Sequence, residues 1–117
     1  MMDVIHGYRT IYPIGLGLVG SFDPEIVKEC TEMAAKEAAA GGIHVSFAPM
    51  VDLARDARWG RVMESCGEDP YLATVMGAAQ VRAFQGDDIS DKEHISACVK
   101  HFAGYGGAEA GRDYNSV

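Results

Sequence analysis

Residues 41–50 read GGIHVSFAPM, and they carry the chain from the end of a helix into a strand. The glycine pair stops a helix because glycine readily adopts the backbone conformation that a helix C-terminus needs. Val45 and Phe47 then alternate with Ser46 and Ala48, which is the two-residue period of a strand. The stretch therefore predicts a helix–strand junction of the kind that α/β folds repeat.

Two helices are predicted on either side of this strand, and both begin in the same way. Asp23-Pro24 places a capping carboxylate before a proline at the first helical position, and Asp69-Pro70 repeats that arrangement. Apolar residues recur at helical spacing after each pair. We expect the first helix to end at Gly41-Gly42 and the second at Gly86.

The predicted element order is β-α-β-α-β, with strands at residues 1–5, 44–50 and 95–102. This order favours an α/β fold with parallel strands and right-handed crossovers. Long loops follow the first two strands, as they do in an α/β barrel, where such loops build the active site. A closed barrel needs eight units and about 250 residues. We therefore predict that residues 1–117 are a fragment, a partial TIM (β/α)8 barrel holding roughly the first three βα units. A small doubly wound open sheet is the alternative.

Charge and motif content exclude several classes of function. The net charge of −7 disfavours nucleic acid and anionic membrane surfaces, because both are bound by Lys/Arg-rich faces. No apolar run reaches the roughly 18 residues of a membrane span. The glycine-rich segments match neither a phosphate-binding loop nor a dinucleotide fingerprint, and the four histidines lack the spacing of zinc ligands. We expect no metal and no cofactor.

Polar side chains gather after each predicted strand. They are Asp3, His6 and Arg9 after the first, Asp52, Arg55, Arg58, Trp59 and Arg61 after the second, and Lys100 and His101 at the end of the third. In a parallel α/β fold the strand ends share one face, so we expect these clusters to converge. Carboxylates accept hydrogen bonds from vicinal hydroxyls, and basic side chains donate into hydroxyl lone pairs. The combination indicates recognition of a polyhydroxyl compound such as a sugar.

Plainer roles compete with binding at several of these positions. Asp3 could cap a loop, His6 could be a structural hydrogen-bond donor, and Arg9 could be a surface charge. Trp59 could pack on the apolar face of a sugar ring or be buried packing. Lys100 ends an apolar strand with a charge, which is costly there unless the charge is paired or used.

Arg55 and Arg58 have a structural interpretation of their own. Both are expected to pair with nearby carboxylates of the same loop, namely Asp56, Glu64 or Glu68. Most of the loop would then hold its own shape through ion pairs, and little of it would face a ligand.

The motifs of the whole chain, taken in order, resemble the N-terminal barrel domain of glycoside hydrolase family 3. They are DVIHG at residues 3–7, TIYP at 10–13, SFD at 21–23, FAP at 47–49, RWGR at 58–61 followed by Glu64, GEDP at 67–70 and VKHF at 99–102. The resemblance is strongest to bacterial β-glucosidases of the exported kind. It implies that the parent protein is periplasmic or secreted; the location of the fragment itself is open.

The resemblance also implies roles for particular residues. Five fall on positions that bind the nonreducing sugar in the −1 subsite: Asp3, Arg9, Arg61, Lys100 and His101. His6, Trp59 and Glu64 are expected to support them. Family members retain configuration through a carboxylate nucleophile and a second carboxylate that acts as acid and then base. The nucleophile lies in a Ser-Asp-Trp-like motif on a later strand and the acid/base in a second domain, so no catalytic residue is assigned in this chain.

The leading hypothesis is a retaining, β-glucosidase-like hydrolase of terminal nonreducing β-D-glucosyl residues, acting in carbohydrate catabolism. This chain would supply sugar-binding residues, and its partners would be the substrate, the remaining barrel and the second domain. A β-xylosidase of the same family is one alternative. A non-catalytic carbohydrate-binding module and a module that binds a phosphorylated metabolite are others. Because a partial barrel leaves strand edges and helix faces open, we also expect the isolated chain to self-associate.

Overall fold

The structure is a computed structural model that describes all of residues 1–117. Its helices and strands are α1 (Gly15–Val19), α2 (Pro24–Ala40), β1 (Val45–Ser46), α3 (Pro70–Gln85) and β2 (Ser96–Ala97), with 3-10 helices at Gly60–Glu64, Tyr105–Gly107 and Glu109–Gly111. β1 and β2 pair in parallel, with Val45 opposite Ser96, and Met2 forms a parallel bridge to Ser46. The predicted α/β fold with parallel strands is confirmed.

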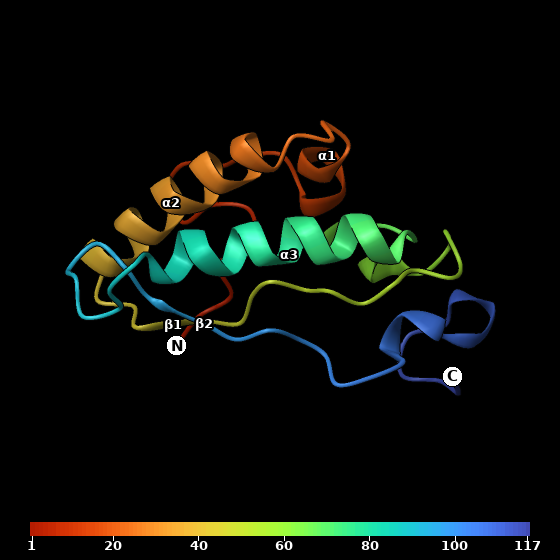
Figure 1. Cartoon of the computed structure of the whole chain (residues 1–117). Coiled ribbons are helices and arrows are strands. Elements are labelled where there is room, and N and C mark those ends of the chain that lie inside the picture. The colour runs from red at the N-terminus through yellow and green to blue at the C-terminus, as the bar shows by residue number, and fades with distance from the viewer.

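The order of the strands distinguishes part of a barrel from a doubly wound sheet. The N-terminal segment, β1 and β2 are neighbours in chain order. As a result α2 and α3 lie side by side on the same side of the strands (Figure 1). A doubly wound sheet places helices on both faces, whereas a barrel keeps them all on the outside. The arrangement is therefore that of part of a barrel.

The strands themselves are shorter than predicted. Regular pairing covers two residues in each of β1 and β2, and the first strand is reduced to the single bridge at Met2. Pairing resumes after an interruption, where Met50 bridges Lys100 in parallel. Pro49 lies in the interruption, and its missing N–H removes a ladder hydrogen bond while its carbonyl still accepts from Lys100 N at 3.0 Å.

Both long helices begin where the sequence predicts. The Asp23 side chain accepts a hydrogen bond from Glu25 N at 2.9 Å, and the Asp69 side chain accepts one from Leu72 N at 2.7 Å. Each carboxylate thus satisfies a backbone donor that the first turn leaves free. The C-caps are Gly41 and, with φ at 58°, Gly86, as expected. Neither helix is long and apolar enough to cross a membrane.

The loop after the first strand contains a short helix that the sequence did not predict. α1 is five residues long and includes two glycines, so it shows no apolar periodicity. What stabilises it is tertiary packing, because Val19 is buried in a cluster with Val27 and Met76. Such short segments form where burial outweighs weak helix propensity.

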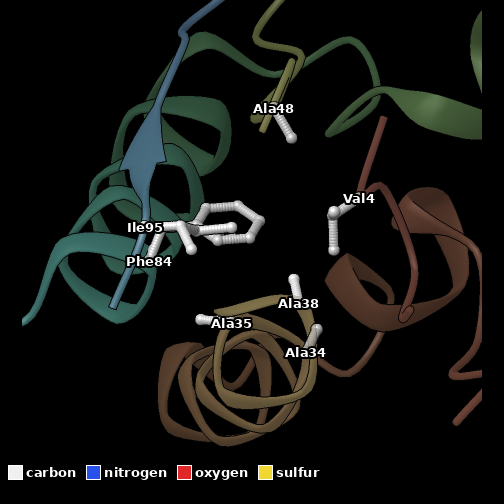
Figure 2. Packing of buried hydrophobic residues seen from close by; sticks show 7 residues of the cluster. All are labelled: Val4, Ala34, Ala35, Ala38, Ala48, Phe84 and Ile95. Carbon is white, nitrogen blue, oxygen red and sulfur yellow. The ribbon is translucent and has the colours of Figure 1, made fainter. Parts of the chain in front are cut away.

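The main core fills the space between the two long helices and the strands. It consists of Val4, Ala34, Ala35, Ala38, Ala48, Phe84 and Ile95, which point toward one another (Figure 2). The alanines of α2 allow α3 to approach closely, and Phe84 fills the space that they leave. Val4 turns inward while its neighbour Asp3 stays exposed, because successive side chains on an extended segment face opposite sides.

One apolar groove continues past the edge of β2. It has a volume of about 390 Å³ and lies against α3, with Val51, Leu53, Val81 and Val99 among its lining residues. Val99 is 55% exposed. The open edge and groove agree with a partial barrel, and the self-association of the chain stays a prediction.

Enlarging Ala35 should destabilise the fold. Ala35 is a fully buried residue of α2 in the cluster that contains Phe84. Ala35→Leu should therefore lower the free energy of unfolding by about 1–3 kcal/mol through overpacking. Trp59 is the only tryptophan and is fully buried, so its fluorescence can follow urea unfolding. The control Ala40→Leu, at the exposed end of α2, should change stability by less than about 0.5 kcal/mol. Equal midpoints for both variants would contradict the close packing.

Candidate functional site

Lys100 links two carboxylates from distant parts of the chain. Its Nζ donates to Asp3 Oδ1 at 3.1 Å and lies 3.8 Å from Glu64 Oε1. The Lys100 side chain is 13% exposed, whereas that of Asp3 is 58% exposed. The half-buried ammonium is thus compensated by two carboxylates, and the Asp3 carboxylate remains open to a ligand.

Arg61 binds the second of these carboxylates through two donors on one edge of its guanidinium. Its Nε donates to one oxygen of Glu64 and its Nη2 donates to the other at 2.9 Å. These hydrogen bonds lower the pKa of Glu64 and raise the pKa of Arg61. A two-point contact fixes the plane of the guanidinium, so Arg61 is held in one orientation beside Lys100.

His101 is held by a buried aspartate. The Asp52 side chain is 2% exposed. Its Oδ2 accepts from His101 N at 3.0 Å and lies 2.7 Å from His101 Nδ1. The peptide bond between Lys100 and His101 is cis. With Nδ1 and the backbone N–H taken by Asp52, the imidazole Nε2 has no protein partner. Asp52 belongs to the polar cluster expected after the second strand, but the sequence indicated no role for it.

Trp59 lies beneath the site and does not line its surface. It is fully buried, and its Nε1 donates to Asp113 Oδ1 at 3.0 Å. Its ring meets the Tyr105 ring edge-to-face, with centroids 5.2 Å apart. Of the two interpretations offered by the sequence, buried packing is the one that the structure supports, because a fully buried ring has no face for a sugar.

Arg9 and His6 lie outside the cluster formed by Asp3, Lys100 and their partners. The loop that holds them turns back toward α2, where the Glu37 carboxylate accepts from the backbone N–H of Arg9 at 2.9 Å. His6 Nδ1 lies 3.0 Å from Tyr12 O within the same loop. The chain reverses direction at this point, where Gly7 and Ile11 form an antiparallel bridge, so the loop does not continue the line of the first strand. A sugar-binding role for Arg9 rests on the resemblance alone.

Only one of the two arginines expected to pair within the loop does so. Arg58 binds Asp56 with a shortest contact of 2.6 Å, and its hydrogen bonds lower the pKa of Asp56 to about 2. Arg55 has no carboxylate partner; its backbone N–H donates to Gly106 O at 3.0 Å. The prediction is therefore confirmed for Arg58 and wrong for Arg55.

Tyr105 and Asp113 are site residues that sequence reasoning missed. Both lie in the glycine-rich C-terminal segment, which has no periodicity to mark an inward face. Tyr105 packs against His101, with ring centroids 4.7 Å apart, and its ring lies 5.4 Å from the Arg61 guanidinium carbon. The one signal in the sequence was the position of Tyr105 shortly after the third strand.

The site borders an open cavity of about 450 Å³. Arg61, His101 and Tyr105 line it together with Phe102 and Tyr114. No three histidine, cysteine or carboxylate side chains come together in a way that could hold a metal ion. The chemistry on offer is therefore hydrogen bonding by fixed charged groups beside aromatic rings, which suits a polar, neutral ligand.

Comparison with known proteins decides the family. All of residues 1–117 match the glycosyl hydrolase family 3 N terminal domain. The chain belongs to this family. A periplasmic beta-glucosidase of Salmonella typhimurium is 48% identical over 98% of the chain, and a beta-xylosidase of Formosa agariphila is 41% identical over 86%. The crystal structure of a beta-glucosidase from Listeria innocua in complex with glucose is 57% identical over 97% of the chain, with a TM-score of 0.94.

The family match covers only part of the relatives. The chain spans 15% of the Salmonella protein, 14% of the Formosa protein and 16% of the Listeria chain. The similarity places it within the N-terminal domain of family 3 and confirms the resemblance of the sequence motifs. The activity of a whole family protein therefore enters below as a proposal.

The Arg61–Glu64 contact predicts a pH-dependent stability. Its hydrogen bonds hold the folded pKa of Glu64 below the unfolded value of about 4.3. The stabilisation is therefore complete above that pH and is lost as the pH falls through the folded pKa. Glu64→Gln should cost about 1–2 kcal/mol of unfolding free energy at neutral pH, and less at an acid pH below the folded pKa of Glu64.

Urea unfolding of both proteins at the two pH values measures this difference. Glu68→Gln is the matched control, because Glu68 is exposed in the same loop. It should leave stability nearly unchanged at both pH values. A Glu64→Gln deficit that stays constant from neutral to acid pH would show that the carboxylate charge contributes nothing.

Proposed function

We propose that this chain supplies part of the −1 subsite of a retaining β-glucosidase. Asp3, Arg61, Lys100 and His101 would hold a terminal nonreducing glucosyl residue, with Glu64 fixing the two cations. The observation that carries the proposal is the Lys100 ammonium, which forms ion pairs with both Asp3 and Glu64 beside Arg61. Membership of family 3 and the similarity to two beta-glucosidases support it.

The cluster offers both hydrogen-bond donors and hydrogen-bond acceptors to vicinal hydroxyls. The exposed Asp3 carboxylate has an oxygen, Oδ2, with no protein partner, and it can accept from a sugar hydroxyl. Lys100 has three ammonium protons. One is donated to Asp3, and Glu64 lies at ion-pair distance, so protons remain to donate to a sugar hydroxyl. His101 Nε2 adds a further group, because Asp52 already holds Nδ1.

Charge balance favours a sugar over a phosphorylated metabolite. Arg61 and Lys100 would be the phosphate ligands, but both are compensated by Glu64 and Asp3. A phosphate would have to displace a carboxylate or bear its repulsion, since like charges in a half-buried site destabilise each other. A neutral polyol has no such cost.

The reacting carboxylates are assigned to parts of the protein outside this chain. Retention of configuration needs a nucleophile and an acid/base on opposite sides of the glycosidic bond. The relatives are about six to seven times longer than the match, as the 14–16% coverage shows, which leaves room for the rest of the barrel and for a second domain. Binding residues in this chain would orient the ring and strengthen their contacts in the oxocarbenium-like transition state.

A β-xylosidase is the second candidate. The 41% identity to the Formosa beta-xylosidase favours it. The Salmonella relative also supports a periplasmic or secreted location for the parent protein.

The isolated chain should hydrolyse no aryl β-glucoside and no aryl β-xyloside. The reason is that it lacks the proposed nucleophile and acid/base. Release of p-nitrophenol by purified residues 1–117, compared with a mock purification from the same host, measures this. Turnover above that background would place the catalytic pair inside the chain.

The binding role of Asp3 can be tested in a chimera. Residues 1–117 would replace the matching segment of the Listeria innocua beta-glucosidase, to which they are 57% identical. Asp3→Ala should lower kcat/KM for p-nitrophenyl β-glucoside by about 100-fold or more, because a hydrogen bond that strengthens in the transition state is lost. Parallel assays with the β-xyloside would rank the two candidate substrates.

Asp87→Ala is the control for this chimera. Asp87 is an exposed aspartate in the loop after α3, and its side chain makes no hydrogen bond. The control should keep the kcat/KM of the unsubstituted chimera. Near-identical kinetics for Asp3→Ala and Asp87→Ala in an active chimera would refute the role of Asp3.

A further inference from the structure

Tyr105 contacts four residues, namely Trp59 and Arg61 of one loop, His101 and Asp113. Its ring packs edge-to-face on Trp59 and on His101, with centroid distances of 5.2 and 4.7 Å. The Arg61 guanidinium carbon lies 5.4 Å from the ring centroid, within the range of a cation–π contact. Its hydroxyl donates to Asp113 Oδ1 at 2.5 Å.

Asp113 fixes the direction of the Tyr105 hydroxyl. One oxygen of Asp113 accepts from both Trp59 Nε1 and the Tyr105 hydroxyl. The hydrogen bond from Trp59 and that from Tyr105 lower the pKa of Asp113, so it is a charged acceptor at neutral pH. Burial raises the pKa of Tyr105 to about 12, so its hydroxyl keeps its proton. Because the hydroxyl proton is engaged in the hydrogen bond to Asp113, the phenol oxygen can only accept further hydrogen bonds.

Arg61 uses that acceptor. Glu64 takes its Nε and Nη2, and Nη1 donates to the Tyr105 hydroxyl at 3.4 Å. The guanidinium is thereby held on both sides, by a carboxylate on one and by a phenol on the other. His101 is likewise held on two sides, by Asp52 at Nδ1 and by the Tyr105 ring.

We propose that Tyr105, anchored through Asp113, is a positioning residue that sets the orientation of Arg61 and His101 toward the sugar. The proposal rests on the proposed function for its ligand, and on the contacts of Tyr105 for its geometry. Tyr105, Arg61 and His101 line the same cavity, so a change in the tyrosine alters the surface that the ligand meets. Errors of about 1 Å in such groups cost on the order of 100-fold in rate.

The positioning of Arg61 can be measured in the 117-residue chain itself. The arginine Nε–H resonances in a ¹H–¹⁵N spectrum report guanidinium orientation, and Arg61→Lys identifies the relevant signal. Tyr105→Phe removes the hydroxyl but keeps the ring, and Tyr105→Leu removes both. We expect the Arg61 signal to shift in the first variant and to broaden or shift further in the second. Tyr71→Phe, at an exposed tyrosine of α3, should leave it in place.

The consequence for the reaction is measured in the active chimera. Tyr105→Phe should lower kcat/KM about tenfold and Tyr105→Leu about 100-fold. The loss should fall mainly on kcat. Both variants should keep melting temperatures well above the assay temperature. Asp113→Ala removes the acceptor of the Tyr105 hydroxyl. It should lower kcat/KM about as much as Tyr105→Phe, and the double variant should lose no more than either alone, because both changes remove the same hydrogen bond. Tyr71→Phe should keep full activity.

The outcomes separate this proposal from the proposed function. An unchanged Arg61 signal in Tyr105→Leu, or full kcat/KM for that variant in an active chimera, overturns the positioning role. A shifted Arg61 signal together with a chimera that lacks β-glucosidase activity supports the positioning of Arg61 and counts against the proposed function. Additive losses in the Tyr105 and Asp113 double variant overturn the part assigned to Asp113.

Discussion

The charge of Lys100 is the constraint around which the site is built. Its side chain is 13% exposed, and a cation so far removed from water is stable only when it is paired and hydrogen-bonded. Asp3 comes to it from the first strand and Glu64 from the loop after β1. Glu64 in turn binds Arg61 through both oxygens. One half-buried charge thereby ties together three segments that the chain order keeps apart.

The arrangement of the strands brings Asp3 and Lys100 together. Because the strands are neighbours in chain order and parallel, both long helices cover the same side and leave the other side free (Figure 1). Successive side chains of an extended segment point to opposite faces, so adjacent residues can serve the core and the site. Val4 faces the helices and packs in the core (Figure 2), while Asp3 faces the other way and meets Lys100. Core and site are two faces of the same strands.

The C-terminal segment completes the arrangement through close backbone approach. A side chain at Gly106 would place its Cβ 2.1 Å from Leu53 O, so only glycine fits there. That contact, together with the hydrogen bond from Arg55 N to Gly106 O, holds the segment against the loop after β1. Tyr105 is carried into contact with Arg61 and His101 as a result. Gly106, in a glycine-rich segment that matched no nucleotide-binding motif, serves this packing.

The amino-acid sequence alone sufficed to predict the helices, the parallel α/β order and the family. Asp-Pro pairs and terminal glycines act locally, so α2 and α3 could be predicted almost to the residue, and the ordered motifs along the chain pointed to family 3. The polar clusters after the strands also nominated Asp3, Lys100 and His101, the last two because a charge at the end of an apolar strand is costly unless it is used. Arg61 was nominated through the resemblance to family 3. Which of the nominated residues meet was settled by tertiary packing. Arg9 turns away with its loop, Trp59 is buried, Arg55 has no carboxylate partner, and Asp52, Tyr105 and Asp113 enter the network. The physical reason is that these outcomes depend on loop direction and on contacts between residues up to 97 positions apart, and neither is encoded in local periodicity.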